Sequence, residues 1–316
     1  MAVPAFVLKK LGLIEESALK PLSIILLYVL QPFLVINAFA SSSVEPSGQV
    51  ALNLLIMFAL GLAAHLIPFA VLKITAYATK KTTEQQKCLR KGALMMSAVF
   101  GNAGFLGVNF IKILVGDNSP AVLYAAAFIC AFNIMLWTLG IFNITNDIKR
   151  VDFKKAFFAP AIIAVFIAIP LFFIPAINLV QIEPMIGKGV KFLADASLPV
   201  SMFVVGLRLG RIGLKELFSD AGVWICCAIR LVAVPLVMFL LMLPLVLTGA
   251  LERIDPNNYI VLVLVIFAAM PVAASVVAFA ERFDGDQATA AKAFLLSTVL
   301  SILTVPAMMM LLVWVL

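Results

Sequence analysis

The sequence predicts an all-α, polytopic membrane protein, and three observations carry that prediction. Apolar residues make up 64% of the 316 positions, charged residues only 12%, and mean hydropathy is +1.15. A soluble domain is usually about half apolar and a quarter charged. The apolar residues fall into long runs, and the basic residues gather in the short breaks between them. We therefore divide the chain into membrane spans of roughly 20 residues.

Ten apolar segments follow one another along the chain. Segment 1, Ala2–Leu8, is too short to cross about 30 Å of hydrocarbon, and its charges follow it, unlike those of a signal peptide. We interpret it as a helix whose start is missing, with a re-entrant segment as the alternative. Segments 2 to 10 are long enough to span: Leu19–Ser41, Val50–Tyr77, Ala93–Val115, Ala121–Phe142, Phe157–Pro175, Gly187–Leu209, Gly222–Leu247, Asn258–Phe283 and Ala288–Val315.

The basic residues give this array an orientation. Placing alternate loops on opposite sides leaves only Lys112, Lys188, Lys191 and Arg253 on one side, with Arg230 inside a segment. The other 18 of the 23 basic residues share the opposite side, which the positive-inside rule identifies as cytoplasmic. We therefore expect a multi-pass protein of the cell membrane with both termini on the non-cytoplasmic side. The net charge of +7 thus comes from basic loops on the cytoplasmic side of the membrane lipid, and it does not indicate a nucleic-acid partner.

The two halves of the chain show a weak internal repeat. Residues 1–142 would form one five-helix unit and residues 157–316 a second, inverted one, with a cytoplasmic linker at 143–156. Segments 4 and 9 are each interrupted by small residues or proline. Asn102 and Pro271 both lie 14 residues before a Gly-Asp pair.

Interrupted helices at matching places in inverted repeats point to the binding site of a transporter. A break frees N–H and C=O groups at membrane depth, which is tolerable where they line a cavity or meet a ligand. The partial positive charge at the N-terminus of a half-helix favours an anionic ligand. The alternative is that these small residues only allow helices to pack closely.

At these residues the sequence resembles the auxin efflux carrier family, whose plant members are the PIN-formed carriers and whose bacterial members transport small organic acids. The resemblance covers nearly the whole chain, and its short central loop is similar to that of bacterial members. The motifs that carry it are Gly101-Asn102-Ala103-Gly104-Phe105-Leu106-Gly107, Leu198-Pro199, Val205-Gly206, Arg208-Leu209-Gly210, Arg230-Leu231 through Pro235, Ala269-Met270-Pro271-Val272-Ala273-Ala274, Phe279-Ala280-Glu281-Arg282-Phe283, and Ser297-Thr298 to Pro306.

The resemblance implies ten transmembrane helices in two inverted five-helix repeats, with broken helices 4 and 9 crossing near the midplane. It implies an elevator-like movement of segments 3–5 and 8–10 against a scaffold of segments 1, 2, 6 and 7. The substrate carboxylate would lie near Asn102 and Pro271. The family usually has proline where this chain has Asn109, whose amide could instead contribute to the site. The truncated segment 1 is a second departure.

The candidate site residues fall into two sets. Asp195, Arg230 and His65 are ionisable groups inside segments, where such groups are functional candidates by default. Their alternatives are an outer-rim position or pairing with Arg230 for Asp195, snorkelling to headgroups for Arg230, and hydrogen-bonded packing for His65. The substrate-binding candidates, of which Asn133 and Ser275 could equally form interhelical hydrogen bonds, are Asn102, Ala103, Gly104, Phe105, Asn109, Asn133, Met270, Pro271, Val272, Ala273 and Ser275.

We expect a secondary transporter for a mono- or dicarboxylate, coupled to protons, sodium or the membrane potential, with no metal and no other cofactor. A homodimer is compatible with this organisation. A sodium symporter of the bile-acid-transporter type is an alternative, but segment 9 has no acidic or amide side chain between Asn258 and Glu281. A membrane sensor that binds ligand without net flux is the second alternative. The sequence lacks the motifs of an intramembrane enzyme.

Overall fold

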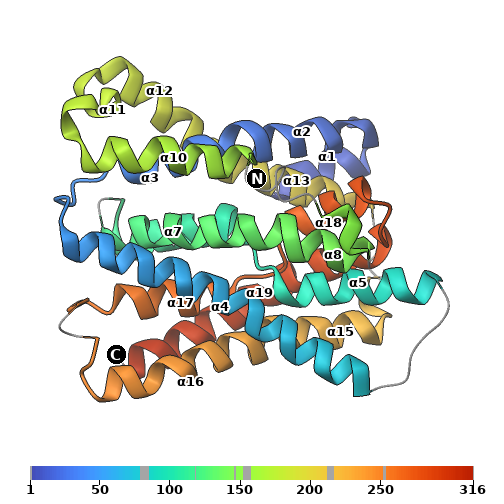
Figure 1. Ribbon diagram of the computed structural model, residues 1–316. Helices are drawn as coiled ribbons and strands as arrows, with labels where there is room; N and C mark the ends of the chain where they lie inside the picture. The colour runs from blue at the N-terminus through green and yellow to red at the C-terminus, as the bar shows by residue number, and fades with distance from the viewer. Residues whose placement is uncertain are drawn as a thin grey trace.

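The computed structural model describes residues 2–78, 85–117, 119–145, 147–151, 158–211, 217–251 and 254–315 (Figure 1). Within these ranges the chain is helical, with one isolated β-type contact discussed below. Part of the predicted linker at 143–156 lies outside the described residues. So do several of the basic residues used to orient the chain: Lys80, Lys81, Lys154, Lys155, Lys215 and Arg253.

The first half of the chain forms helices close to the predicted segments. In chain order these are α1 (Ala2–Lys10), η1 (Glu16–Ala18), α2 (Leu19–Ile25), η2 (Leu26–Leu30), α3 (Gln31–Ala40), α4 (Gly48–Ala78), α5 (Gln85–Val99), η3 (Ala103–Gly107), α6 (Val108–Val115), α7 (Pro120–Met135), η4 (Leu136–Gly140), α8 (Ile141–Thr145) and η5 (Ile148–Arg150).

The second half departs from the predicted segments in two places. Segment 6 is helical over only 14 residues, and segment 7 is divided at Ala196. In chain order the elements are α10 (Pro160–Phe173), η6 (Pro175–Ile177), α11 (Leu179–Ile182), α12 (Pro184–Asp195), α13 (Ser197–Arg211), α15 (Ala221–Ala228), η7 (Ile229–Ala233), α16 (Val234–Leu247), α17 (Tyr259–Ala269), α18 (Ala274–Arg282) and α19 (Gln287–Val315).

Six helical stretches in the described residues are long and apolar enough to cross a membrane: Leu19–Ala40, Gly48–Ile74, Pro120–Thr145, Pro184–Gly210, Ala221–Leu247 and Gln287–Trp314. Three further apolar helices are shorter, namely Ala103–Val115, Pro160–Phe173 and Tyr259–Ala269. The chain is therefore a helical, multi-pass membrane protein. The arrangement of ten spans in two inverted repeats remains a prediction.

Four of the described elements are π-helical turns: η2, η4 and η7 lie inside longer helices, and η3 is the first turn of the half-helix that continues as α6. The turns η2 and η7 each end just before a helix with proline in its first turn, where a backbone N–H is missing. At the end of η7, the N–H of Val234 reaches back to the carbonyl of Ile229. Such turns change which face of the helix the following side chains occupy, and they are frequent at functional sites.

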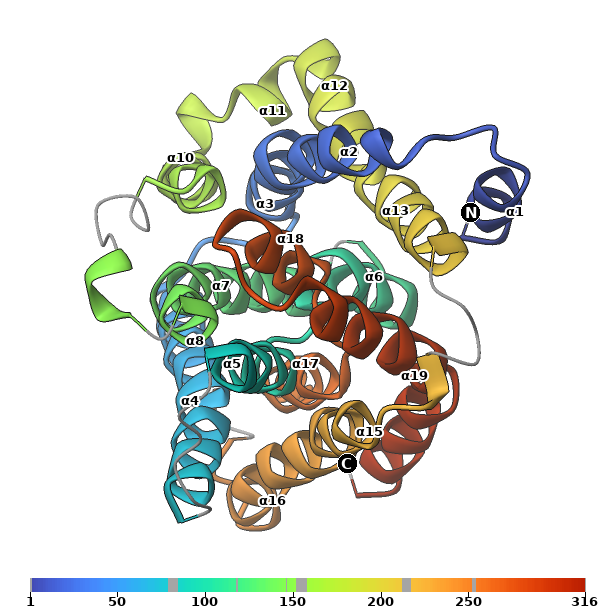
Figure 2. The same ribbon diagram turned by 90° about the vertical axis from the view of Figure 1, so that its right-hand side faces the viewer.

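The helices pack as two groups (Figure 2). The first helix group consists of α1, α2–η2–α3 and α10 to α13, with α1 against α13 and both α10 and α12 against α3. The second helix group consists of α4 to α8 and α15 to α19, with α4 against α7, α16 against α17 and α15 against α19. The largest apolar core lies mainly in the second group. Phe105 of η3 instead joins the core of the first group, beside Leu26 and Val204.

Candidate functional site

Segments 4 and 9 are both discontinuous. The helix α5 ends at Val99 and η3 begins at Ala103, while α17 ends at Ala269 and α18 begins at Ala274. The residues between the halves are not helical: Asn102 has φ −77° and ψ 55°, and Met270 has φ −63° and ψ 144°. Each break frees backbone groups that an uninterrupted helix would have paired.

The two breaks pair with each other. Gly101 and Val272 form an antiparallel β-bridge. On one side of it the N–H of Asn102 donates to the carbonyl of Pro271 at 2.6 Å, and on the other the N–H of Ala273 donates to the carbonyl of Phe100 at 2.9 Å. These bonds satisfy backbone groups that would be costly to leave unpaired at membrane depth.

Ser297 of α19 completes the pairing of the segment 9 break. Its hydroxyl accepts a hydrogen bond from the N–H of Val272 at 3.0 Å and donates one to the carbonyl of Phe294, also at 3.0 Å. Ser297 is fully buried. The Ser297 side chain is thus a buried polar partner for the segment 9 break.

Arg230 lies at the centre of both breaks. Its guanidinium donates four hydrogen bonds of 2.9 Å to backbone carbonyls at the ends of the two half-helices, and the side chain is buried. The predicted alternatives of snorkelling to headgroups and of pairing with Asp195 are therefore wrong. The acceptors are the carbonyls of Val99, at the end of α5, and of Phe267, Ala268 and Met270, at the end of α17.

Gly101 allows this approach of the guanidinium. A Cβ atom at position 101 would overlap the terminal nitrogen and central carbon of the Arg230 side chain. The glycine is needed here for close backbone approach rather than for a positive φ. A void of about 10 Å³ adjoins both residues.

His65 lines the same void but belongs to a packing arrangement. Its Nδ1 lies 2.6 Å from the carbonyl of Gly61, one turn earlier in α4. Its ring contacts those of Phe100, Phe128 and Phe132 at centroid distances between 5.2 and 5.6 Å. Of the two interpretations of His65, a functional ionisable group or a hydrogen-bonded packing residue, this environment supports the second.

The amide of Asn102 stands out among the predicted substrate-binding residues. Asn102 precedes η3, it is buried, and its Nδ2 has no hydrogen-bond partner. A buried donor without a partner carries a penalty of about 1 to 3 kcal/mol. A bound acceptor at this position would remove that penalty.

The other predicted residues surround the breaks or lie apart from them. Asn109 and Asn133 donate within their own helices, to Phe105 and Ile129 respectively, each at 2.8 Å. Asp195 is exposed at the end of α12. Buried at the breaks are Ala103, Gly104, Phe105, Met270, Pro271, Val272, Ala273 and Ser275.

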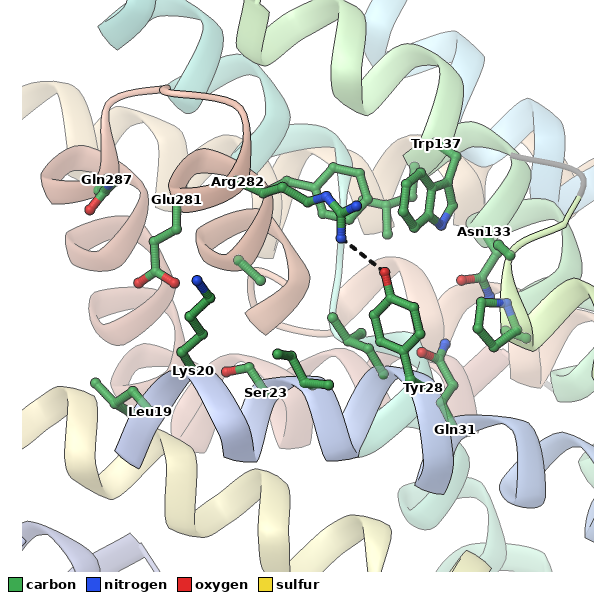
Figure 3. A pocket seen from close by; sticks show the side chains of 18 residues that line it. Leu19, Lys20, Ser23, Tyr28, Gln31, Asn133, Trp137, Glu281, Arg282 and Gln287 are labelled. Atoms are coloured by element: carbon green, nitrogen blue, oxygen red, sulfur yellow. Dashed lines mark hydrogen bonds between the residues drawn. The ribbon is translucent and has the colours of Figure 1, made fainter. Parts of the chain in front are cut away.

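A cavity of about 620 Å³ lies between the two helix groups (Figure 3). The first group contributes one wall from α2, η2 and the start of α10, and the second contributes residues of α7, η4, α18 and α19. Asn133 is the only predicted substrate-binding residue among those that line it. Gln31 also lines it and connects it to the segment 4 break, because a Cβ at Gly104 would lie 3.5 Å from the Gln31 amide nitrogen.

Charged residues at the end of α18 connect the two groups beside this cavity. Arg282 donates to the hydroxyl of Tyr28 at 3.0 Å, the bond drawn in Figure 3. Its neighbour Glu281 forms an ion pair of 3.3 Å with Arg208 of α13. Lys20 adds a second cation to the lining.

Sequence reasoning did not single out several of these residues as site residues. The sequence did offer a signal for two of them: Gln31 directly precedes Pro32, and Ser297 is the first residue of one of the motifs shared with the family. Their partners, however, come from distant helices. The role of Tyr28 likewise depends on a contact with Arg282, 254 residues away.

Comparison with known proteins agrees with this architecture. A family profile described as membrane transport protein matches residues 1–153 and 143–309. A search of the curated proteins gave no match. The two matched ranges together span nearly the whole chain. The chain belongs to the membrane transport protein family, the auxin-efflux-carrier-like family that the sequence motifs indicated.

Proposed function

We propose that the protein is a secondary transporter that carries a small organic anion, such as a mono- or dicarboxylate, across the cell membrane. The observation that carries this proposal is the cavity of about 620 Å³ between the two helix groups. Its volume lies within the usual range for small-molecule sites, about 300 to 1,000 Å³. It reaches Gln31, which lies beside η3 and the segment 4 break.

The polar lining of the cavity favours an anion. Lys20 and Arg282 are cations, and Gln31 and Asn133 carry amides. Glu281, the acidic residue of the lining, is engaged with Arg208. A carboxylate that moves from this cavity toward η3 would meet the unpaired amide of Asn102 and the N-terminal end of the half-helix, both of which attract negative charge.

The packing of the helices supports a mechanism of alternating access. The first helix group consists of segments 1, 2, 6 and 7, and the second of segments 3–5 and 8–10, the same division that we expect between a scaffold and a mobile bundle. The paired breaks lie in the second group, except that Phe105 packs into the core of the first. We propose that the second group moves as a unit, as an elevator, and carries the anion at the breaks.

Flux into proteoliposomes tests this function. We expect saturable uptake of labelled small carboxylates such as lactate or succinate, with a loss of at least about tenfold in Asn102→Ala, the cost of one good hydrogen bond to a charged ligand. Asn143→Ala is the matched control, because Asn143 also has a buried amide without partners but lies in α8, away from the breaks. Equal flux in both variants would contradict the proposed site. Ligand binding without net flux would indicate a sensor.

A further inference from the structure

The arrangement around Arg230 resembles a cation site whose cation is part of the protein. Four carbonyl oxygens converge on the guanidinium, each at 2.9 Å. All four belong to the last turn or the cap of a half-helix, where carbonyls carry partial negative charge. The Phe267 carbonyl also accepts a hydrogen bond from the N–H of Met270. In transporters with discontinuous helices, such carbonyls are the groups that coordinate a coupling cation.

Within the described part of the chain, no ion pair joins Arg230 to a carboxylate. The observed partners of the positive charge are instead the partially negative carbonyl ends of the two half-helices. Burying a guanidinium is costly unless its donors are satisfied. The four carbonyls supply that compensation.

Two further features hold the guanidinium in this position. Arg230 lies within the π-helical turn η7, whose altered register directs the side chain toward the breaks. Gly101 leaves the space that the guanidinium occupies, because any Cβ there would overlap it. Two separate segments thus contribute: η7 carries the guanidinium, and the segment 4 break provides the space for it at Gly101.

We propose that Arg230 is a tethered counter-cation that takes the place of a coupling ion at the paired breaks, and that its carbonyl cage binds a free monovalent cation only when the side chain is removed. The coupling part of this inference rests on the proposed transport function. The cage itself does not, because it concerns the folded protein alone. A charge that stays in place through the cycle would also make transport of the anion insensitive to replacing sodium by choline.

The test measures the apparent melting temperature (Tm) of purified protein in detergent, in choline chloride, sodium chloride or a low concentration of guanidinium chloride at equal ionic strength. We expect Arg230→Ala to lose several degrees in choline and to regain most of that loss in guanidinium or sodium. Arg230→Met should show the same loss without recovery, because its side chain fills the cage but carries no charge. Met238→Ala, a buried position two turns further along the same span, is the control and should not respond to the cation.

Arg230→Lys keeps the test informative if Arg230→Ala does not fold, because an ammonium ion can satisfy part of the cage. It should melt between wild type and Arg230→Met. Equal melting of the Lys and Met variants, or an Arg230→Ala protein that ignores both cations, would overturn the inference. Absence of carboxylate flux in wild-type proteoliposomes would refute the transport function and leave the melting result intact, so the two failures are distinguishable.

Discussion

The two breaks of the second helix group pair with each other, but different kinds of residue form them. The break in segment 4 is rich in glycine and continues as the π-helical turn η3, whereas the break in segment 9 is formed around Pro271 and continues as the regular helix α18. Around the segment 9 break the N–H groups of Val272 and Ala273 have partners, in Ser297 and Phe100.

The segment 4 break is different because it keeps one buried donor without a partner, the amide of Asn102. An unpaired buried amide destabilises the folded state unless something binds to it. We infer that segment 9 stabilises the paired breaks while segment 4 provides the contact to the proposed ligand. This division of roles leads to four predictions, which begin with the strongest effect.

Gly101→Ala should damage both breaks at once. The added Cβ would displace the Arg230 guanidinium from its carbonyls, and we expect a loss of about 3 kcal/mol in stability from this overpacking. Gly104→Ala is the matched control, because a Cβ there meets only the flexible Gln31 amide at 3.5 Å. Thermal unfolding in detergent compares the two. Similar melting temperatures for both variants would show that the guanidinium does not need the space at Gly101.

Ser297→Ala should weaken the segment 9 break. Removing the hydroxyl leaves the buried N–H of Val272 without its acceptor, at a cost of about 2 kcal/mol. Ser301→Ala lies one turn further along α19 and removes only a bond to the carbonyl of Thr298 in the same helix, so it should be nearly neutral. Thermal unfolding distinguishes the variants, and an equal response would remove the structural role of Ser297.

Asn102→Ala, unlike Ser297→Ala, should reduce anion flux and leave stability nearly unchanged. Its Nδ2 has no partner to lose, so we expect stability to change by less than about 1 kcal/mol even though anion flux falls. The informative measurement is therefore the pair of values, melting temperature and flux, from the same preparation. A large fall in melting temperature would place Asn102 with Ser297 among the structural residues.

The smallest expected effect is at Asp255, which lies just before α17, the first half-helix of segment 9. Its Oδ2 accepts from the N–H of Ile260 at 2.6 Å, and burial raises the pKa of its carboxyl above the usual 3.8. A raised pKa means that the folded state holds the proton more tightly, so this residue's contribution to stability falls as pH rises from about 4 through the folded pKa. Asp255→Asn retains an acceptor and should flatten the part of a melting-temperature profile that lies above the usual carboxyl pKa. An unchanged profile would assign the pH dependence to other groups.

Hydropathy predicted most of the helix positions, because the length of an apolar run directly limits a span. The run Leu19–Ser41 became the helical stretch Leu19–Ala40, and Val50–Tyr77 became Gly48–Ala78. The π-helical turns were not predictable, since they depend on one backbone register and leave the apolar pattern unchanged. The division of segment 7 at Ala196 was missed for the same reason.

The predicted interruptions of segments 4 and 9 are confirmed, whereas the predicted binding site stays a prediction. Asn102 and Pro271 were selected from small residues and proline, whose effect on a helix is local. The hydrogen bonds of Arg230 to the two breaks could not be predicted from the sequence, because the carbonyls that accept them lie on two other segments. Ser297 and Gln31 were missed for a similar reason, since each acts on a break or a cavity formed by distant residues.

The bridge between Gly101 and Val272 also has a consequence for how the protein is made. The ribosome completes segment 4 long before segment 9, so the first break enters the bilayer without the partner that satisfies its N–H and C=O groups. Exposed backbone groups are costly in hydrocarbon. The nascent first half must therefore keep this stretch shielded, as continuous helix or against the insertion machinery, until Arg230 and segment 9 arrive. The pairing of the two breaks thus makes the final structure of the first half depend on the completed second half.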